Sequence, residues 1–432
     1  MTLRNLSADR PNITLDFRKS KKLDPRITFT RASYAPASDP SSGTGTSGGT
    51  IQEFNVNVPR LTDQGLLIEE SRTNFFQDSR IANQSFWGAD HVTSTTILAP
   101  DGSFAEKCAE KAQDSPHGFQ QGIPGLASST QTTFSIYAKA AGRNWVSIGF
   151  QDGSVGYSAY TSFDLSTGTI GTNKHTGTII NRPASASITP AGNGWYRLEV
   201  SRGTNGAQVF VFMTDSNPTG NGNIDLFTYT GGSNGDGIYL FGPQVEEQSY
   251  SGGFATSYIP TAGAQVTRAE DLCEITNDEL SSWYNSSGGT YVTEFNSVGY
   301  GGTIPVYVNF IKGNTGRLEF NMDGVVYGLY NVQMKYGLNS PAFLNHVDNK
   351  IAMAHSWLTG EGGYSSNGIT PIVTAAKNPA PGPYDPTRMA FGFTLYQNIG
   401  YGVSGYIQRF SYYPTRVSDD ALQALTTQQD ND

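Results

Sequence analysis

The chain has 432 residues, of which 37% are hydrophobic and only 15% are charged, and it holds 50 glycines, 21 prolines, 23 tyrosines and 23 phenylalanines. This abundance of turn residues and aromatics, with few long charged side chains, favours many short strands over long helices, and the length predicts two or three domains. The net charge of −9 argues against nucleic-acid binding, because a protein that displaces counterions from phosphates needs a basic surface.

Basic residues are concentrated at the start of the sequence. Residues 1–31 carry eight Lys or Arg and three Asp side chains, a net charge of +5 that leaves −14 for the remainder. We predict a basic N-terminal arm with docking strands over residues 1–75, since "NITLDF" and "RITFTRA" alternate as strands do. Such an arm can dock on an acidic surface, or its charges can simply face water. The opening residues lack an apolar signal core and no run suits a membrane span, so membrane insertion is not expected.

The middle of the chain is dense in strand signals. In "TFSIYAKA", Phe134 and Ile136 take one face of a strand and Tyr137 takes the other. Residues 209–212 are apolar on both faces, which predicts a central strand. Short strands between Gly- and Asn-rich turns indicate an antiparallel jelly-roll sandwich over residues 76–271.

The last part of the chain predicts a second sandwich over residues 272–432. Asn367-Gly368 lies between alternating runs and is a type I′ hairpin signal. Ser418 is suited to cap a short C-terminal helix, with Val417 and Leu422 at the positions of a hydrophobic staple.

Motifs of common enzymes are missing from the sequence. There is no glycine-rich phosphate loop ending in Lys-Ser/Thr, no His-Glu-x-x-His and no Gly-x-Ser-x-Gly, and the five histidines are scattered. Glu294 and Glu319 are each alone in their predicted strands, whereas glycoside hydrolysis needs two positioned carboxyl groups. We therefore expect no enzymatic activity. Cys108 and Cys273 are expected to be small buried residues, with no disulfide framework.

One loop offers oxygen ligands for a cation. The segment "DSNPTGNGNID" begins at Asp215, and a further acid follows in "SNGDG". The candidate calcium ligands are Asp215, Asn217, Asp225 and Asp236. Hard cations take such oxygens, but Leu226 stands where an EF-hand has its glutamate. Asx turns explain the same residues without a metal. Apart from calcium, no cofactor is expected.

Aromatic side chains are the candidates for ligand binding. Flat rings offer apolar area to the face of a sugar while polar neighbours bind its hydroxyls. The candidate glycan-binding rings are Tyr137, Trp145, Tyr157, Tyr160, Trp357 and Tyr364. The alternative is that these outward rings pack against a neighbouring subunit or the other domain.

Several phrases occur in the order of a known family. They are "LDPRITFTRAS" (23–33), "GLLIEESRTNFFQDSRIANQSFW" (65–87), "GNGWYRLEV" (192–200), "GPQVEEQSYSGGFATSYIPTAGAQVTRAEDL" (242–272), "SSWYNSSGGTYVTEF" (281–295) and "GYIQRFSYYPTRVSDDALQALT" (405–426). Together they resemble structural proteins of tailed bacteriophages that carry tandem carbohydrate-binding-like and laminin-G/concanavalin-like domains. The basic arm and the Gly/Ser-rich insertion at 37–50 lie outside this pattern.

The resemblance implies a fold. The expected class is all-β, with two antiparallel β-sandwich (jelly-roll/concanavalin-like) domains, an N-terminal arm and a short C-terminal helix. Residues 76–271 would be the carbohydrate-binding-like domain and residues 272–432 the laminin-G-like one.

The resemblance also implies a role. The expectation is a non-enzymatic virion surface protein (tail fibre, baseplate part or adhesin) that displays glycan-binding-like sandwiches for host attachment and is assembled in the host cytoplasm. A head decoration that braces the capsid is an alternative, and a polysaccharide depolymerase is another. The expected partners are other virion proteins of capsid or tail, a host surface glycan, and further copies of the chain in a homo-oligomer such as a trimer. Nucleic acid is not an expected partner.

A repeated phrase predicts one structural contact. "FTRA" at 29–32 returns as "VTRA" at 266–269, next to the predicted domain boundary. We expect Arg31 and Arg268 to form a clasp in which each arginine pairs with an acid. The acids considered are Glu69, Glu70 and Glu270.

Overall fold

The structure is a computed structural model. It describes residues 10–20, 22–38, 50–126, 131–152, 156–175, 185–203, 208–220, 224–248, 253–300, 306–312, 316–321, 326–329, 333–336, 348–356, 359, 361–375, 385–392 and 403–427.

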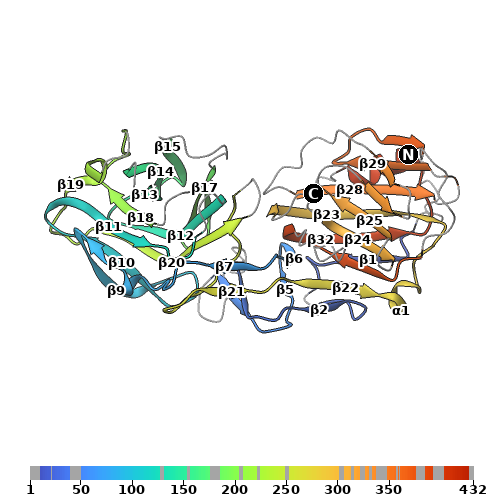
Figure 1. Cartoon of the computed structure of the whole chain (residues 1–432), viewed down its shortest axis with the longest axis horizontal. Coiled ribbons are helices and arrows are strands. Elements are labelled where there is room, and N and C mark those ends of the chain that lie inside the picture. The colour runs from blue at the N-terminus through green and yellow to red at the C-terminus, as the bar shows by residue number, and fades with distance from the viewer. Residues whose placement is uncertain are drawn as a thin grey trace. The chain divides into compact units, whose positions relative to one another are not determined.

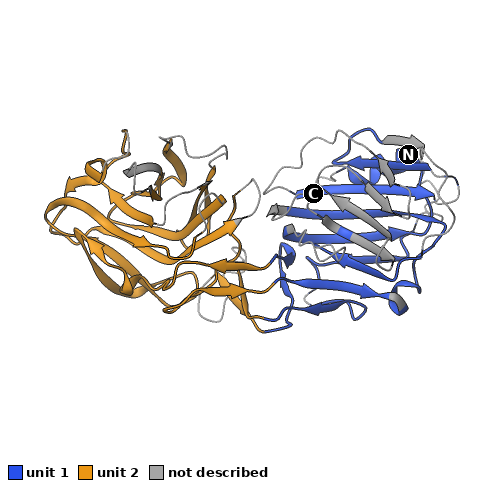
Figure 2. Ribbon diagram, in the orientation of Figure 1, with its two compact units in different colours: residues 1–32, 56–70, 270–432 blue, residues 33–55, 71–269 orange. Residues whose placement is uncertain are grey.

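The chain forms two compact units, and neither is a continuous segment (Figure 2). Unit 1 comprises residues 1–32, 56–70 and 270–432, and unit 2 comprises residues 33–55 and 71–269. The chain therefore passes from one unit to the other four times. The region expected to be a separate arm and docking strands, residues 1–75, is divided between the units, because its strands pair with strands from later in the chain.

Unit 1 contains two antiparallel sheets (Figure 1). The first has the strand order β30 (Ile372–Ala375), β29 (Glu361–Ser366), β28 (Asp348–Ser356), β23 (Gly288–Tyr300), β32 (Val403–Tyr413), β6 (Gly65–Ile68) and β5 (Arg60–Thr62), with β1 (Ile13–Asp16) also paired to β32. The second has the order β2 (Thr28–Thr30), β22 (Leu272–Thr276), β31 (Arg388–Phe391), β24 (Val306–Lys312), β25 (Gly316–Asn321), β26 (Val326–Leu329) and β27 (Gln333–Tyr336).

One core joins the two sheets of unit 1. Period-two alternation directs Ile13 and Leu15 of β1 inward and leaves Thr14 exposed. These residues share a buried cluster with Tyr291 and Phe410 of the same sheet and with residues of β22 and β31 in the other sheet. The segment "NITLDF" therefore forms a strand, as predicted, and that strand is an integral part of this sandwich.

Unit 2 contains two larger antiparallel sheets and two short two-stranded sheets. One sheet has the order β16 (Ser185–Pro190), β17 (Tyr196–Gly203), β12 (Gln131–Ala141), β20 (Gly237–Gln248), β10 (Phe104–Glu110) and β9 (Ala89–Leu98). The other has β15 (Thr169–His175), β14 (Gly156–Asp164), β13 (Trp145–Asp152), β18 (Gln208–Thr214), β11 (Asp114–Gly122) and β19 (Thr228–Thr230), with β8 (Phe86–Trp87) paired to β11. The short pairs are β7 (Arg72–Asn74) with β21 (Val266–Arg268), and β3 (Ala35–Ser38) with β4 (Ile51–Phe54).

The core of unit 2 lies between its two larger sheets. Phe134 and Ile136 of β12 point into it, as the alternation of that strand predicts. Strand β18 lies between β13 and β11, and both of its faces are buried. Val209 and Val211 face the core, whereas Phe210 and Phe212 join a second cluster on the other side of the sheet. The prediction of a central strand at 209–212 is confirmed.

Helices are few and short in the described part of the chain. They are α1 (Asn277–Leu280), α2 (Asp419–Thr426) and the 3-10 turns η2 (Ile81–Asn83) and η3 (Ile224–Phe227). Ser418 caps α2, because its side chain accepts a hydrogen bond from the Ala421 N–H at 3.3 Å. Val417 and Leu422 are buried together in one cluster, which confirms the predicted staple. None of the helices in the described ranges is long and apolar enough to cross a membrane.

The expected all-β class is therefore correct: both units are antiparallel sandwiches, and the chain carries a short helix near its C-terminus. The predicted hairpin at Asn367-Gly368 is also present. Both residues have positive φ angles, of 45° and 77°, and the Ile369 N–H bonds back to the Ser366 carbonyl at 2.9 Å.

Candidate functional site

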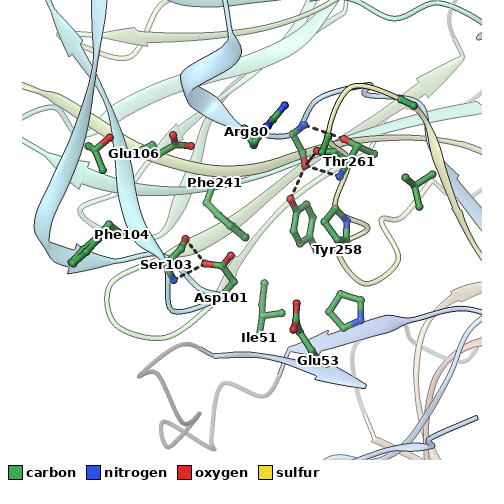
Figure 3. A pocket seen from close by; sticks show the side chains of 17 residues that line it. Ile51, Glu53, Arg80, Asp101, Ser103, Phe104, Glu106, Phe241, Tyr258 and Thr261 are labelled. Atoms are coloured by element: carbon green, nitrogen blue, oxygen red, sulfur yellow. Dashed lines mark hydrogen bonds between the residues drawn. The ribbon is translucent and has the colours of Figure 1, made fainter. Parts of the chain in front are cut away.

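Unit 2 carries a pocket of about 660 Å³ over the outer face of the sheet that contains β20 (Figure 3). Its lining residues are Pro36, Ile51, Glu53, Ser79, Arg80, Thr93, Asp101, Ser103, Phe104, Glu106, Phe241, Tyr258, Pro260, Thr261, Ala262, Ala264 and Val266. All of them belong to unit 2. The volume falls within the range usual for small-molecule sites.

The floor of the pocket is an aromatic cluster on the outer face of the sheet. Phe241 of β20 lies with its ring centroid 5.0 Å from that of Tyr258 and 5.8 Å from that of Tyr137. Ile51 of β4 and Trp195 belong to the same cluster. Strand residues that point away from the main core are thus covered by a second apolar layer, and the pocket opens at the edge of that layer.

A glycine next to Phe241 permits this packing. Gly242 has a φ of 61°, and an added Cβ would lie 2.9 Å from a ring carbon of Tyr258. Any other residue at position 242 would be strained in its backbone and would displace the Tyr258 ring.

Hydrogen bonds hold the segment that contains Tyr258 against the turn before η2. The Tyr258 hydroxyl lies 2.7 Å from Ser79 Oγ, and the Thr261 N–H donates to Ser79 Oγ at 3.0 Å. The Ser79 N–H in turn reaches the Thr261 carbonyl at 3.1 Å. Burial raises the pKa of Tyr258, so its hydroxyl stays protonated. This part of the wall is pre-organised by side chains that are themselves buried.

Acidic side chains supply most of the charge on the wall. Asp101 accepts bonds from Ser103 N at 3.0 Å and from Ser103 Oγ at 2.7 Å, which closes the turn before β10. Glu53 accepts a bond from the Tyr34 hydroxyl at 2.6 Å. In Figure 3, Asp101 and Glu53 lie on the side of the pocket that carries Ile51.

On the opposite side in Figure 3 lie Glu106 and Arg80. Glu106 accepts the Ile81 N–H at 2.9 Å and the Ala82 N–H at 3.2 Å, and His91 Nε2 lies 3.1 Å from it. Arg80 donates from both Nε and Nη2 to Asp78, with a distance of 2.7 Å for Nε. This ion pair lowers the pKa of Asp78 to about 2.

This arrangement suits a polar ligand with one apolar face. Phe104, at the rim, is 55% exposed, although it is a large hydrophobic side chain. Exposed rings beside hydroxyls and carboxylates are the groups that protein sites offer to sugars. Among the described residues, no group of three His, Cys, Asp or Glu side chains is placed to hold a metal ion.

Of the aromatic residues singled out from the sequence, those whose side chains the structure describes do not assemble into a site. Tyr137, Tyr160 and Tyr364 are all buried, so the expectation that they face outward and stack on a sugar is wrong. Trp145 is half-buried and packs over Gly171, where an added Cβ would lie 2.5 Å from its ring. The side chain of Tyr157, and Trp357 as a whole, lie outside the described residues.

Covering layers explain the buried rings. Tyr137 does point away from the main core of unit 2, but the layer that forms the pocket floor covers it. Tyr160 also leaves that core, and η3 covers it: its ring centroid is 5.2 Å from that of Phe227. Tyr364 belongs to the core of unit 1. The alternation of the two unit 2 strands was predicted correctly, but the layers that cover Tyr137 and Tyr160 were not predicted.

The candidate calcium ligands are engaged in turns or lie on the surface. Asn217 Oδ1 accepts the Thr172 N–H at 3.1 Å, and Asp215 accepts a bond from Ser216 Oγ at 3.1 Å. Asp225 is exposed in η3, and Asp236 lies against Gly142. The structure does not bring these four residues together as a cluster.

The two arginines of the predicted clasp belong to different units. In unit 1, Arg31 Nη1 donates to Asp271 Oδ1 at 3.0 Å, an acid adjacent to the Glu270 that was considered. In unit 2, Arg268 Nη1 donates to the Ala269 carbonyl at 3.2 Å, and its strand pairs with β7 at Arg72. The last residue of the second phrase also meets the residue that follows the first one: within unit 2, the Ala269 N–H donates to Ser33 Oγ at 2.9 Å.

The sequence interpretation missed the pocket residues. Phe104, Phe241 and Tyr258 occur in unremarkable strand and loop segments, and their meeting depends on pairings between distant strands. Asp101-Gly102 was the one available signal, because this dipeptide marks a turn. It gave no indication that the turn borders a pocket.

Comparisons with known proteins give only distant likenesses. No family model matches the chain. No curated protein sequence matches it either. The similar solved structures include the CBM40 module of Ruminococcus gnavus IT-sialidase bound to α2,3-sialyllactose, with 18% identity, a TM-score of 0.28, and coverage of 35% of this chain and 88% of that one. Domain 4 of AbnA, a GH43 extracellular arabinanase from Geobacillus stearothermophilus, in complex with arabinotriose, has 10% identity, a TM-score of 0.31, and coverage of 41% and 83%.

Domains LG4-5 of the mouse laminin α1 chain are also similar, with 10% identity, a TM-score of 0.24, and coverage of 80% of this chain and 95% of that one. Identity and TM-scores this low give no basis for transferring a ligand or an activity.

Proposed function

We propose that unit 2 binds carbohydrate in the pocket over β20, and that the chain is a non-enzymatic surface protein of a tailed-phage virion. One observation supports the binding role: a 660 Å³ pocket combines exposed and half-buried rings with hydroxyl and carboxylate groups. Such a lining offers apolar area to the C–H face of a sugar and hydrogen-bond partners to its hydroxyls.

Binding at this site is expected to be weak for a single copy. The pocket is open and several of its polar side chains are exposed, so a sugar keeps part of its hydration shell. A dissociation constant of about 1 mM corresponds to about −4 kcal/mol. Many copies on one particle raise the effective affinity without new contacts, which suits a protein displayed on a virion.

A titration of the full chain with neutral oligosaccharides, followed by NMR or calorimetry, tests the binding role. Replacement of the rim ring, Phe104→Ala, should weaken binding by about fivefold or more, since an aromatic contact contributes about 1 kcal/mol beyond its area. Trp87→Ala is the matched control, because Trp87 is 44% exposed but does not line the pocket. Two results would contradict the proposal. One is a broad glycan array that gives no binding at millimolar concentration. The other is an affinity of the Phe104→Ala variant that equals those of the Trp87→Ala variant and of the unaltered chain.

The virion location rests on the sequence phrases that resemble tailed-phage structural proteins. Mass spectrometry of purified virions of the source phage should detect the chain, and its absence from them would overturn this part of the proposal. Labelled particles viewed at low resolution would distinguish tail attachment from head decoration: density over capsomers favours a role in bracing or decorating the shell.

The acidic side chains of the pocket are the reason to test the depolymerase alternative. Three carboxylates, those of Glu53, Asp101 and Glu106, line one pocket, and glycoside hydrolysis uses a pair of positioned carboxyl groups. We expect no release of reducing ends when the chain is incubated with host polysaccharide. Release that is lost in Asp101→Asn or Glu106→Gln would replace the binding proposal with an enzymatic one.

A further inference from the structure

We infer that the pocket of unit 2 selects sugars with a free ammonium group, that is, 2-amino sugars and their oligomers, over N-acetylated and acidic sugars. This inference rests on the proposed function, because it names the class of carbohydrate that the same pocket takes. It is carried by the charges of the lining, by their partners, and by the exposed ring at the rim.

The charge of the described lining is negative. Among the residues that the structure describes, the charged side chains of the lining are those of Glu53, Arg80, Asp101 and Glu106, and none is a lysine. The Arg80 guanidinium is occupied by the adjacent Asp78, which does not line the pocket, through two parallel bonds. The two charges of such a pair neutralise each other, so the Arg80 guanidinium attracts an anionic ligand only weakly. Three carboxylates are left without a cation of their own among the lining residues.

Two of these carboxylates keep an oxygen available for a ligand. Both bonds to Asp101 in the described part of the chain go to Oδ1, from the backbone and the hydroxyl of Ser103. The bond from Tyr34 to Glu53 goes to Oε2. The remaining oxygens of Asp101 and Glu53 can therefore accept from a ligand without breaking these contacts.

Glu106 has a structural role in the wall of the pocket. Its two oxygens already accept the N–H groups of Ile81 and Ala82, and His91 lies beside it. It fixes the wall at η2 and adds to the negative potential of the pocket. Asp101 and Glu53 are consequently the groups that we expect to meet an ammonium ion.

An exposed ring lies on the same rim as these acids. Phe104 is 55% exposed and follows Ser103 directly in the chain. The face of an aromatic ring attracts a cation, and it also accepts the apolar face of a pyranose. An amino sugar can use both contacts together with a charge-assisted hydrogen bond to a carboxylate.

Other sugars lose one or more of these contacts. An N-acetyl group removes the positive charge and replaces it with a neutral amide. A uronic or sialic acid would bring its own carboxylate towards Asp101, Glu53 and Glu106, and like charges brought together discriminate against a ligand. The order of affinity should therefore be ammonium sugar, then neutral sugar, then acidic sugar.

The test compares three tetrasaccharides with the full chain by calorimetry: β-1,4-linked glucosamine, β-1,4-linked N-acetylglucosamine, and α-1,4-linked galacturonic acid. At about pH 6 an amine of this kind carries its proton and carboxylates are ionised. We expect the glucosamine tetramer to bind about tenfold more tightly than its acetylated form at low salt. The ratio should shrink as salt is added, because the acids are largely exposed.

A double variant separates the pocket from the general negative charge of the protein. Glu53→Gln with Asp101→Asn should bring the glucosamine and N-acetylglucosamine tetramers to similar affinities while keeping binding of the acetylated one. Asp114→Asn with Asp225→Asn is the matched control: it makes the same change in net charge at exposed acids of unit 2 outside the pocket. This control should keep the preference.

The outcomes distinguish the two levels of the proposal. Equal affinity for the charged and acetylated tetramers, or tighter binding of the galacturonic acid tetramer, overturns the inference while carbohydrate binding stands. Equal loss of the preference in both double variants also overturns it, because net charge alone would then explain the preference. Failure of all three tetramers to bind, with no other glycan bound on an array, overturns the proposed function itself.

Discussion

Glu110, in β10 of unit 2, has a fully covered side chain and four hydrogen bonds to hold it. Arg143 donates to both of its oxygens at 2.8 and 2.7 Å, the Tyr229 hydroxyl donates at 2.7 Å, and the Gly232 N–H donates at 2.7 Å. Burial opposes ionisation, but these donors overcome it and lower the pKa of Glu110 to about 2. The carboxylate is thus a stabilising element rather than a reactive one.

Glu110→Gln should lower the free energy of unfolding of unit 2 by roughly 2–4 kcal/mol at neutral pH, because it leaves a partly buried Arg143 without its charge partner. The folded-state pKa lies below the ordinary value of 4.5, so this stability is present above about pH 4.5 and is lost as the pH falls toward 2. Denaturant unfolding of both proteins across this pH range should show their difference shrinking.

Asp90→Asn is the control for that measurement. Asp90 forms an exposed pair with Lys111 at 2.8 Å, and such a pair contributes about 0–1 kcal/mol. A loss in Asp90→Asn as large as that in Glu110→Gln would contradict the importance assigned to the buried network.

His355, in β28 of unit 1, gives a second pH dependence. Its ring stacks on Tyr291 with centroids 5.4 Å apart and planes 7° from parallel, and burial lowers its pKa to about 3. Unfolding restores the usual value near 6.5, so the unfolded chain binds the extra proton. The free energy of unfolding should therefore fall as the pH drops from about 6.5 toward 3, by about 1.4 kcal/mol per pH unit from this group.

The measurement is denaturant unfolding between these two pH values. His355→Phe keeps a ring on Tyr291 but has no proton to gain, so the slope of stability against pH should be smaller by that amount. An unchanged slope in this variant would show that other groups cause the acid sensitivity.

At the scale of elements, four buried charges join three separate segments of unit 1. Arg31 follows β2, Arg60 begins β5, Glu69 follows β6 and Asp271 precedes β22. Arg60 donates to Glu69 at 2.6 Å and also to Asp271, which accepts from Arg31 and from the Glu69 N–H at 2.9 Å. Burial alone would lower the pKa of Arg60, but the two carboxylates overcome this and raise it.

Asp271→Asn should destabilise unit 1 by roughly 3–5 kcal/mol, since it leaves two buried guanidinium groups facing one carboxylate. Asp24→Asn is the control, because the Arg26–Asp24 pair is partly exposed and joins neighbours in sequence. Urea unfolding of both variants measures the difference. A similar small effect in both would mean that the cluster contributes nothing to the fold beyond its packing.

Periodicity in the sequence predicted single strands well and predicted what covers them poorly. Phe134, Ile136 and the residues of β18 were placed on the correct faces, since alternation is a local property. Tyr137 and Tyr160 were expected to be exposed, but a second layer from distant segments covers each of them. The pocket was missed for the same reason: it is formed where one such layer ends, and no local pattern encodes that edge.

The whole molecule consists of two units with separate hydrophobic clusters. We predict two transitions in calorimetric unfolding, because compact units with their own cores generally unfold as separate cooperative blocks. Asp271→Asn should lower only the midpoint of unit 1 and Glu110→Gln only that of unit 2, each by about 5–10 °C. A single transition that both variants shift equally would contradict this.

The discontinuity of unit 1 has a consequence for its synthesis on the ribosome. Unit 2 ends at residue 269, so all of its strands are available before most of unit 1 has been made. Strand β1, in contrast, pairs Asp16 with Arg409, about 390 residues later. At a translation rate of about 5–20 residues per second, β1 leaves the ribosome about 20–80 s before its partner. The strand itself has only two large apolar side chains, Ile13 and Leu15, and Arg18 and Lys19 follow close behind Phe17. These charges limit aggregation of the nascent chain during that wait.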